Sequence, residues 1–561
     1  MELHQRIVSA PVDFGAVRTE FGLASGYPPE AVSEARGAVD AFAGGRVDRR
    51  EIPLVTIDPV GAMDLDQALC LTRTPDGFLL YYAIADVAAF VVPGGPLAQA
   101  SLVRGQTFYF PDGTVPLHPT VLSEDRASLL PDVDRPAALW TIECDENAEP
   151  LRYSVTRALV RSRARLDYAA VQADADAGRL HPAITALPDF GRLRIAAGLR
   201  RGAINLRLPA QSVVRDDEQT GIDHWQLVLE PRTAADDWNE QVSLLTGMCA
   251  ARIMLDGNNS TAPGKPARTS PEAATKSAGS GDASANGGAQ AGSAARTDGG
   301  AHANSEAASN AAAATPEAND HLGLLRTMPP PASAAIESMH RTAAAVGVRW
   351  PKTESAGQLL AGLDANTPAA LVLMSEATSL LRGASYTIPN GQSPDTLQHS
   401  AIGAAYAHVT APLRRLADRY ATEICLSHCA GTEVPQWVHE GLAPVADVMR
   451  RTDALANKVE RACLDLTEAT VLAPRLGTDF DAVVLREATP TRPAEIFIPT
   501  PPVLAKCTGT PPEGTPVTVR LTTSDPTTRT VTFAYPAIDA NGDGAMPPNS
   551  SPGRGKPPSA S

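Results

Sequence analysis

The chain has 561 residues, 43% of them hydrophobic, and a net charge of −15 at neutral pH. No apolar run approaches the roughly 18 residues of a membrane-spanning helix, and the first residues lack the apolar stretch of a secretory signal, so we expect a cytoplasmic protein without membrane contact. Seven scattered cysteines argue against a disulfide framework. The negative charge predicts weak binding to bulk nucleic acid.

Residues 1–50 are predicted to form a short helical segment. A helix is expected to begin at Tyr27-Pro-Pro-Glu30 and to run through a Glu- and Ala-rich stretch to Ala41, because proline is favoured at the first helical turn. Gly44 and Gly45 follow as a stop signal.

An acidic segment follows a short β-branched run. Residues 55–67 read VTIDPVGAMDLDQ and bring Asp58, Asp64 and Asp66 close together in the chain. Asp64 and Asp66 are two apart, so their side chains leave an extended chain on the same face, and the Pro-Val-Gly turn can fold Asp58 back beside them. Clustered carboxylate oxygens suit Mg²⁺. The simpler alternative is an acidic surface loop.

Residues 51–470 are predicted to form a mixed α/β (α+β) catalytic domain, in which strands such as 78–85 (FLLYYAIA) alternate with helices such as 236–255. Cys425 and Cys429 flank His428 and suggest zinc, but the stretch reads as a helix without a partnering pair, which favours buried cysteines.

Residues 257–320 interrupt this domain with a stretch dominated by Gly, Ala, Ser, Asn and Thr. Such a composition cannot bury enough apolar surface to fold, so we expect a disordered insertion. A passive insertion is favoured over a protein-binding or regulatory one, because the cost of closing a loop grows only slowly with its length.

Residues 478–536 are predicted to form short β-strands, whose position and spacing resemble a small OB-like β-barrel. Four short strands are expected, at 480–485, 494–498, 517–521 and 530–534, with turn signals between them. Basic residues are few there, so we expect a mainly structural role. The tail, residues 537–561, is rich in Gly, Pro and Ser and is predicted to be disordered.

Residues 56–68 (TIDPVGAMDLDQA) resemble the signature of the RNB (ribonuclease II/ribonuclease R) family of 3′→5′ exoribonucleases, T-I-D-P-x-x-A-x-D-x-D-D-A. Further resemblances follow in the family's order, at 107–111 (TFYFP), 115–119 (VPLHP), 201–204 (RGAI), 406–418 (YAHVTAPLRRLAD) and 459–461 (VER). The resemblance covers roughly residues 50–470. It implies an RNB catalytic domain in a form that lacks N-terminal cold-shock domains.

The resemblance implies a catalytic set of Asp58, Asp64, Asp66 and Arg414. The three aspartates would hold Mg²⁺, with Asp66 at the position most central to catalysis. Arg414 matches the arginine that contacts the scissile phosphate, a role that a planar guanidinium fits well.

A second set would bind RNA. Tyr109 and Tyr168 match tyrosines that stack near the 3′ end, although each alone would more often be a packing residue. Glu240 and Glu460 match acidic residues placed to accept from ribose hydroxyls. The role of Arg415, which follows Arg414 in the sequence, is more ambiguous.

Two positions depart from the family pattern. Gln67 stands where the family has a fourth Asp, so the predicted site has one charge fewer, and a weak metal contact through its amide oxygen implies weak occupancy of a second ion. Leu206 stands where ribonuclease II has a clamping phenylalanine, so one side of the base stack is missing.

The favoured function is a hydrolytic, Mg²⁺-dependent 3′→5′ exoribonuclease that degrades single-stranded RNA to 5′-nucleoside monophosphates. The alternative is a weakened or inactive RNB-fold protein that binds RNA as an adaptor. A nucleotide-sugar transferase built on Asp64 and Asp66 is disfavoured, because no Gly-rich nucleotide-binding βαβ unit is present.

Overall fold

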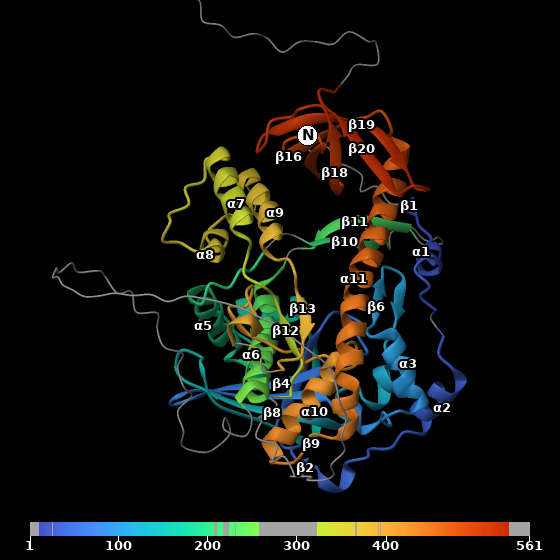
Figure 1. Cartoon of the computed structure of the whole chain (residues 1–561), viewed down its shortest axis with the longest axis vertical. Coiled ribbons are helices and arrows are strands. Elements are labelled where there is room, and N and C mark those ends of the chain that lie inside the picture. The colour runs from blue at the N-terminus through green and yellow to red at the C-terminus, as the bar shows by residue number, and fades with distance from the viewer. Residues whose placement is uncertain are drawn as a thin grey trace, which may run out of the picture. The chain divides into compact units, whose positions relative to one another are not determined.

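The computed structural model describes residues 10–24, 26–206, 210–216, 224–230, 232–256, 322–364, 367–390, 392 and 394–537 (Figure 1). The predicted insertion at 257–320 and nearly all of the predicted tail lie outside these residues, so their predicted disorder stays a prediction.

The N-terminal segment holds two short helices, α1 (Gly15–Glu20) and α2 (Pro29–Gly37). Helix α2 begins near the proline pair as predicted, because Pro29 has the fixed φ of a first helical turn, but it ends four residues before Ala41. Ala31 and Ala35 are fully buried against the main core, which anchors the segment to the body.

A six-stranded sheet forms the centre of the body, in the order β2-β9-β3-β4-β5-β8, with β8 also paired to β9. Its strands are β2 (Val47–Asp48), β3 (Leu54–Asp58), β4 (Gln67–Thr74), β5 (Gly77–Ala85), β8 (Asp134–Cys144) and β9 (Pro150–Asp167). The strand predicted at 78–85 is therefore confirmed as β5. The acidic segment connects the end of β3 to the start of β4.

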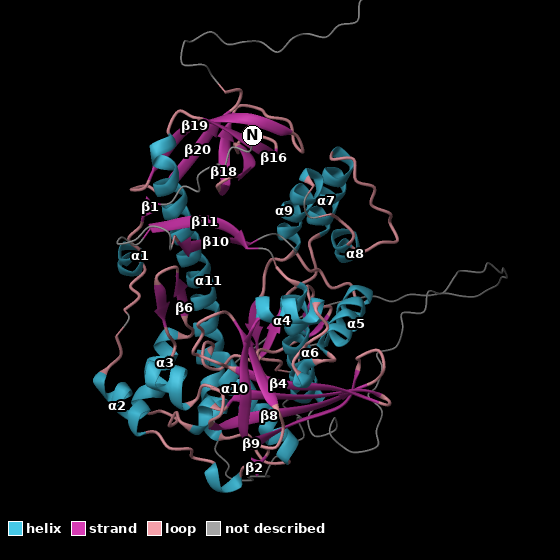
Figure 2. Ribbon diagram, turned by 180° about the vertical axis from the view of Figure 1, so that it is seen from behind, coloured by secondary structure: helices cyan, strands magenta, loops and turns pink. Residues whose placement is uncertain are grey.

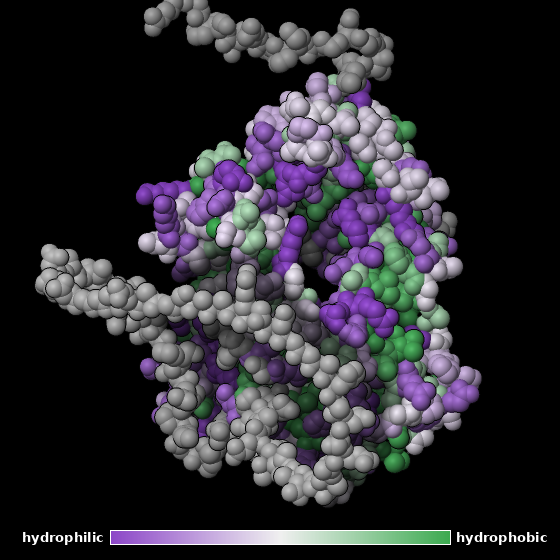
Figure 3. All heavy atoms as spheres, in the orientation of Figure 1, coloured by the Kyte–Doolittle hydropathy of each residue, from purple (hydrophilic) through white to green (hydrophobic). Residues whose placement is uncertain are grey.

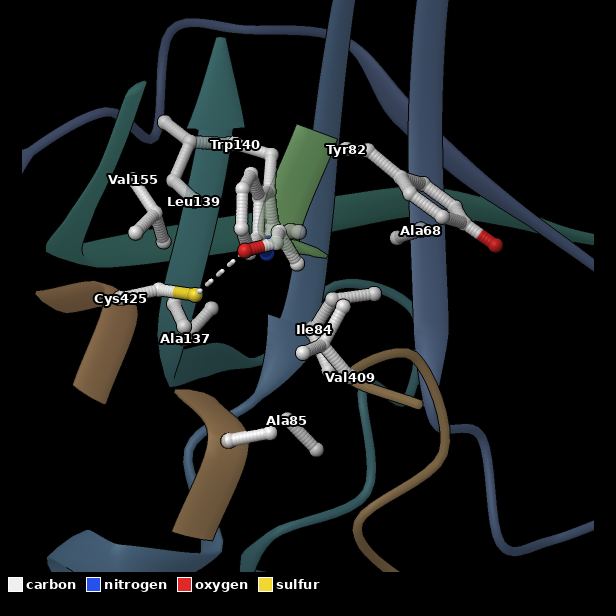
Figure 4. Close-up of a cluster of buried hydrophobic side chains, with 14 of the residues drawn as sticks. Ala68, Tyr82, Ile84, Ala85, Ala137, Leu139, Trp140, Val155, Val409 and Cys425 are labelled. Atoms are coloured by element: carbon white, nitrogen blue, oxygen red, sulfur yellow. Dashed lines mark hydrogen bonds between the residues drawn. The ribbon is translucent and has the colours of Figure 1, made fainter. Parts of the chain in front are cut away.

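Helices cover this sheet, as Figure 2 shows. They are α4 (Tyr168–Asp176), α5 (Leu187–Arg200), α6 (Ala234–Asp256) and α10 (Leu416–Ala430). Helix α11 (Gln436–Leu472) packs against α10 and against α3 (Pro96–Arg104). Helix α6 confirms the helix predicted at 236–255, and α10 packs against both α6 and β9. Figure 4 shows Cys425 of α10 in the core near Trp140 and Val155, and its thiol contacts the Ala250 carbonyl.

Short strands complete the body. They are β1 (Ala10–Pro11), β6 (Phe108–Phe110), β7 (Gly113–Val115), β10 (Ala210–Arg215), β11 (His224–Glu230), β12 (Leu325–Thr327), β13 (Ser385–Thr387), β14 (Gln398–His399) and β15 (Ala404–Ala405). The pairing of β1 with β11 gives the N-terminal segment a strand that was not predicted.

Three further helices, α7 (Ser333–Ala345), α8 (Ala356–Ala361) and α9 (Pro368–Ala377), share a small core of their own. Leu206 packs against this core. Helix α9 contacts the barrel, where Glu376 pairs with Arg486 at 2.7 Å. On the face shown in Figure 3, hydrophilic residues gather over α7, α9 and the neighbouring end of the barrel.

The C-terminal strands close into a five-stranded barrel in the order β16-β17-β18-β20-β19, which confirms the predicted OB-like barrel. The strands are β16 (Asp479–Arg486), β17 (Ala494–Pro499), β18 (Pro502–Thr508), β19 (Pro516–Asp525) and β20 (Thr530–Ala534). Of these five barrel strands, the sequence analysis missed β18. Its residues alternate between buried and exposed like the others, but it starts directly after β17, so no long turn signal marks it.

Two general expectations can be compared with the structure. None of the helices in the described part of the chain combines the length and the apolar character needed to cross a membrane. All seven cysteines carry free thiols, and six of them are buried.

Candidate active site

The aspartate loop, residues 58–67, is fixed by its backbone. The Ser128 hydroxyl accepts from the Leu65 N–H at 3.0 Å and donates to the Met63 carbonyl at 2.6 Å. The Asp66 carbonyl accepts from the Ala85 N–H at 2.9 Å. Because the Leu65 side chain is fully buried, alternation along the extended chain directs Asp64 and Asp66 to the opposite side. A buried serine thus determines where these two carboxylates lie.

The arginine turn, residues 410–415, leads into α10. Asp418, fully buried in the first turn of that helix, accepts from the Ala411 N–H at 2.6 Å. It also accepts from Nε and Nη2 of Arg415, at 3.0 and 2.9 Å. Val409, just before the turn, lies in the buried cluster with Ala68 and Ile84 (Figure 4). The turn is therefore held to the core on both sides.

Asp66 connects the aspartate loop to the arginine turn. Its Oδ1 accepts from the Leu413 N–H at 2.7 Å, and its Oδ2 lies 3.6 Å from Arg414 Nε. The Arg414 carbonyl accepts from the Thr107 N–H at 3.0 Å, and Thr107 leads directly into β6, which carries Tyr109. Three residues predicted for the site, far apart in sequence, are thus brought into one neighbourhood.

The three aspartates are in surroundings that disfavour their charge. Burial, assisted by the charge of Asp64, raises the pKa of Asp58 to about 6, although Arg414 and Arg165 oppose the shift. Burial also raises the pKa of Asp64, and raises that of Asp66 well above its usual value. A cation bound beside these carboxylates would favour their charged forms and so oppose the effect of burial.

The aspartate loop presents oxygen atoms that suit a divalent cation. Asp58 Oδ2 is buried and makes no hydrogen bond of normal geometry with the described residues, although the nearby Thr56 side chain acts to lower the pKa of Asp58 against the larger effect of burial. This oxygen is therefore free to contact a ligand. Over the same residues, no three His, Cys, Asp or Glu side chains are already arranged around one point for a metal. Mg²⁺ commonly binds one or two carboxylates and completes its shell with water and phosphate oxygens. The aspartate loop could hold such an ion together with a phosphate.

Gln67 is turned toward the arginine turn. Its amide Nε2 donates to the Thr410 carbonyl at 2.5 Å. The predicted metal contact of Gln67 stays a prediction, whereas this hydrogen bond is a contact that the sequence alone did not reveal.

The residues predicted to bind RNA lie in different settings. Tyr109 is 52% exposed, so it is available for stacking. Tyr168 is half-buried at the start of α4, and its hydroxyl accepts from Asn239 at 3.2 Å. Burial raises the pKa of Tyr168. Glu240, half-buried on α6, is paired with Arg232. Glu460 is exposed on α11.

Arg415 differs from Arg414 in its environment. Although burial opposes its charge, the contact with Asp418 raises the pKa of Arg415. The side chain of Arg414 is 45% exposed, whereas that of Arg415 is 20% exposed and is occupied by Asp418. The structure therefore leaves Arg414 as the more accessible guanidinium of the two.

A cavity of about 320 Å³ opens beside Arg414, and Tyr109 and Arg415 line it together with other residues. Sequence reasoning missed three of those: Arg326, Tyr386 and His408. Arg326 pairs with Asp453 at 2.8 Å, and the Tyr386 hydroxyl lies 2.8 Å from His408 Nδ1. His408 stands inside the segment 406–418 and could have been found there. Arg326 and Tyr386 lie on β12 and β13, which carry no motif.

Comparison with known proteins agrees with this arrangement. The RNB domain pattern matches residues 46–281, and that of the RNase II-type exonuclease C-terminal S1 domain matches residues 478–535. The chain contains an RNB domain. Its RNB domain contains the aspartate loop, and the closed barrel is its S1 domain.

Ribonuclease R of Chlamydia muridarum is 30% identical over 252 residues, which cover 44% of this chain and 36% of that protein. The chain thus spans about a third of the length of the first curated relatives that it matches.

Two solved structures show how widely the RNB fold is shared. Mycoplasma genitalium RNase R in complex with ribose-methylated single-stranded RNA is 16% identical, with a TM-score of 0.73 over 93% of this chain and 77% of that one. Yeast Ssd1, a pseudonuclease, is 13% identical, with a TM-score of 0.57 over 88% of this chain and 55% of that one. The fold therefore occurs both in a protein named as an RNase and in one named as a pseudonuclease, so function depends on the site.

Proposed function

We propose that the protein is a hydrolytic, Mg²⁺-dependent 3′→5′ exoribonuclease that releases 5′-nucleoside monophosphates from single-stranded RNA. The observation that carries the proposal is the junction at Asp66, where one carboxylate contacts both the backbone and the arginine of the turn. The proposal is supported by carboxylates, which suit a cation, lying beside a guanidinium, which suits a phosphate.

Phosphodiester hydrolysis needs a nucleophilic water and neutralisation of the charge that develops on the phosphate. A bound Mg²⁺ supplies a water with lowered pKa and a positive charge at the reacting oxygens. Asp58, Asp64 and Asp66 are the residues that would hold it. Arg414 is exposed and only 3.6 Å from Asp66, so its guanidinium can contact the phosphate that the cation also contacts.

The same neighbourhood offers a way to hold RNA without reading its sequence. Tyr109 presents an exposed ring beside a cavity lined by Arg326, Arg414 and Arg415. A stacked base contributes about 1–3 kcal/mol whatever its identity. The net charge of −15 belongs to the chain as a whole, whereas the charged residues that line this cavity are three arginines and one aspartate, Asp453. Tyr168, Glu240 and Glu460 are proposed as further RNA contacts.

The second candidate is an RNA-binding adaptor without activity. Gln67 favours it, because the site has one carboxylate fewer than the family pattern, and so does the pseudonuclease that shares the fold. Hydrolysis is preferred because Asp58, Asp64, Asp66 and Arg414 are all present and their segments meet.

A labelled-RNA assay separates the two candidates. A single-stranded oligoribonucleotide with a 5′ label is incubated with Mg²⁺ or with a chelator, and a second oligoribonucleotide carries a blocked 3′ end. The proposal predicts a ladder that shortens from the 3′ end only with Mg²⁺ and an open 3′ end. Binding of intact RNA without any shortening would favour the adaptor.

A further inference from the structure

Gln67 makes a contact that an aspartate at this position could not make. Its Nε2 donates to the Thr410 carbonyl at 2.5 Å. A carbonyl oxygen can only accept, so the group facing it has to be a donor, and ionised carboxylates have no proton to donate. We propose that Gln67 is a positioning residue that fastens the arginine turn to β4 and so keeps Arg414 beside Asp66.

Two adjacent residues hold the same turn, one as a hydrogen-bond acceptor and the other as a donor. Asp66 accepts from the Leu413 N–H at 2.7 Å, while Gln67 donates to the Thr410 carbonyl. The two bonds attach to the turn three residues apart, one through an N–H and one through a carbonyl. Together they resist rotation of the turn about either single contact, which fixes the direction in which the Arg414 side chain leaves it.

The other attachments of the turn lie on different sides. Asp418 holds it from α10 through Ala411 and Arg415, and Thr107 holds the Arg414 carbonyl from the segment before β6. The hydrogen bonds from Asp66 and Gln67 join the turn to the aspartate loop. Gln67 therefore controls the separation of Asp66 and Arg414, now 3.6 Å.

A carboxylate at position 67 would act against this arrangement. It would face the Thr410 carbonyl oxygen with a second acceptor, next to the buried Asp66. The turn would then move away, and Arg414 with it. This expectation is opposite to that of the charge-deficit argument from sequence, which predicts that an added carboxylate strengthens metal binding and raises activity.

The test uses three variants of the full chain. Gln67→Glu keeps the shape and removes the donor, Gln67→Met keeps the size without charge or donor, and Gln67→Asp restores the residue of the family pattern. Gln99→Glu is the matched control, because Gln99 also donates to a backbone carbonyl, that of Gly94 at 2.9 Å, but from an exposed position on α3.

Amide hydrogen exchange over residues 411–415 is the first measurement, and it needs no activity. We expect exchange there to become about tenfold faster or more in all three Gln67 variants and to stay unchanged in Gln99→Glu. Unchanged exchange in Gln67→Glu and Gln67→Met would overturn the proposal, whether or not the protein degrades RNA. Thermal melting of each variant verifies that the exchange reports the turn and not global unfolding.

The second measurement rests on the proposed function and uses RNA hydrolysis as its readout. Loss of a group that orients a catalytic residue typically costs about 10–100-fold in rate. We expect a fall of that size in kcat for all three Gln67 variants, with little change in KM, at every Mg²⁺ concentration. A rise in activity of Gln67→Asp at low Mg²⁺ would contradict the positioning role. If the parent chain degrades no RNA, the proposed function fails and the exchange result still decides the role of Gln67.

Discussion

The arginine turn and the S1 barrel each contain an arginine that binds an aspartate through two nitrogens, and the two pairs differ in burial. Arg415 contacts Asp418 at 2.9 and 3.0 Å, and Arg520 contacts Asp479 at 2.7 and 2.9 Å. The side chain of Asp418 is fully buried, whereas that of Asp479 is 40% exposed. Similar geometry therefore has different energetic weight, because water screens the pair in the barrel.

The two regions also differ in the interactions that stabilise them. The arginine turn is irregular backbone held by buried polar contacts to residues distant in sequence, so each contact contributes to a defined geometry. The barrel is regular and is held by an apolar core, including Ile496, Val519 and Phe533, that does not depend on any single polar pair. Substitutions in the arginine turn should accordingly have a larger effect than equivalent substitutions in the barrel.

The largest effect is expected from Asp66→Asn. The amide oxygen can still accept from the Leu413 N–H, so folding should be retained, but the charge for the cation is lost. We expect RNA hydrolysis to fall on the order of a thousandfold while RNA binding persists. Rates from a gel and binding by filter retention measure both. Asp189→Asn, at an exposed aspartate paired with Arg192, is the control. Hydrolysis by Asp66→Asn at the parental rate would show that the site is elsewhere.

The paired aspartates give the next largest effect. Asp418→Asn leaves a largely buried arginine without its counter-charge and should lower the free energy of unfolding by about 3 kcal/mol. Asp479→Asn should lower it by less than about 1 kcal/mol. Urea unfolding of both variants measures the two losses. Equal losses would show that burial does not make the pair in the turn more stabilising than the pair in the barrel.

Tyr109→Ala is expected to change the length of the final RNA fragment more than the stability of the protein. The ring is exposed, so its removal should leave stability nearly unchanged. A base stacked near the 3′ end helps to decide when the remaining strand is too short to hold, so the final fragment should become longer. Tyr109→Phe should keep the parental fragment length. An unchanged fragment in Tyr109→Ala would assign the tyrosine to packing.

Deletion of residues 258–319 should have the smallest effect. The segment is dominated by small and polar residues, and a chain of that composition contributes little buried apolar surface. Melting temperature and turnover should both stay at parental values. A large drop in melting temperature would show that the segment packs on the domain, and a loss of turnover alone would indicate a role in guiding RNA.

Sequence reasoning succeeded where the signal is local. A continuous apolar run predicted β5, and short β-like stretches between turn signals predicted four of the five barrel strands. The cluster of aspartates led to a proposed site. Sequence reasoning could not show that Ser128 fixes the backbone beside Asp64, that Gln67 contacts Thr410, or that Asp418 occupies Arg415, since each contact joins residues far apart in the chain or depends on a side-chain direction. Arg326 and Tyr386 were missed for the same reason.

We propose that the junction of the aspartate loop and the arginine turn hydrolyses RNA. The most direct measurement is mass spectrometry of the mononucleotides released in ¹⁸O-labelled water with Mg²⁺. The proposed chemistry predicts 5′-monophosphates that each carry one ¹⁸O from water, formed by the parent chain and lost in Asp66→Asn. Absence of mononucleotides from the parent chain, or equal release by Asp66→Asn, would contradict it.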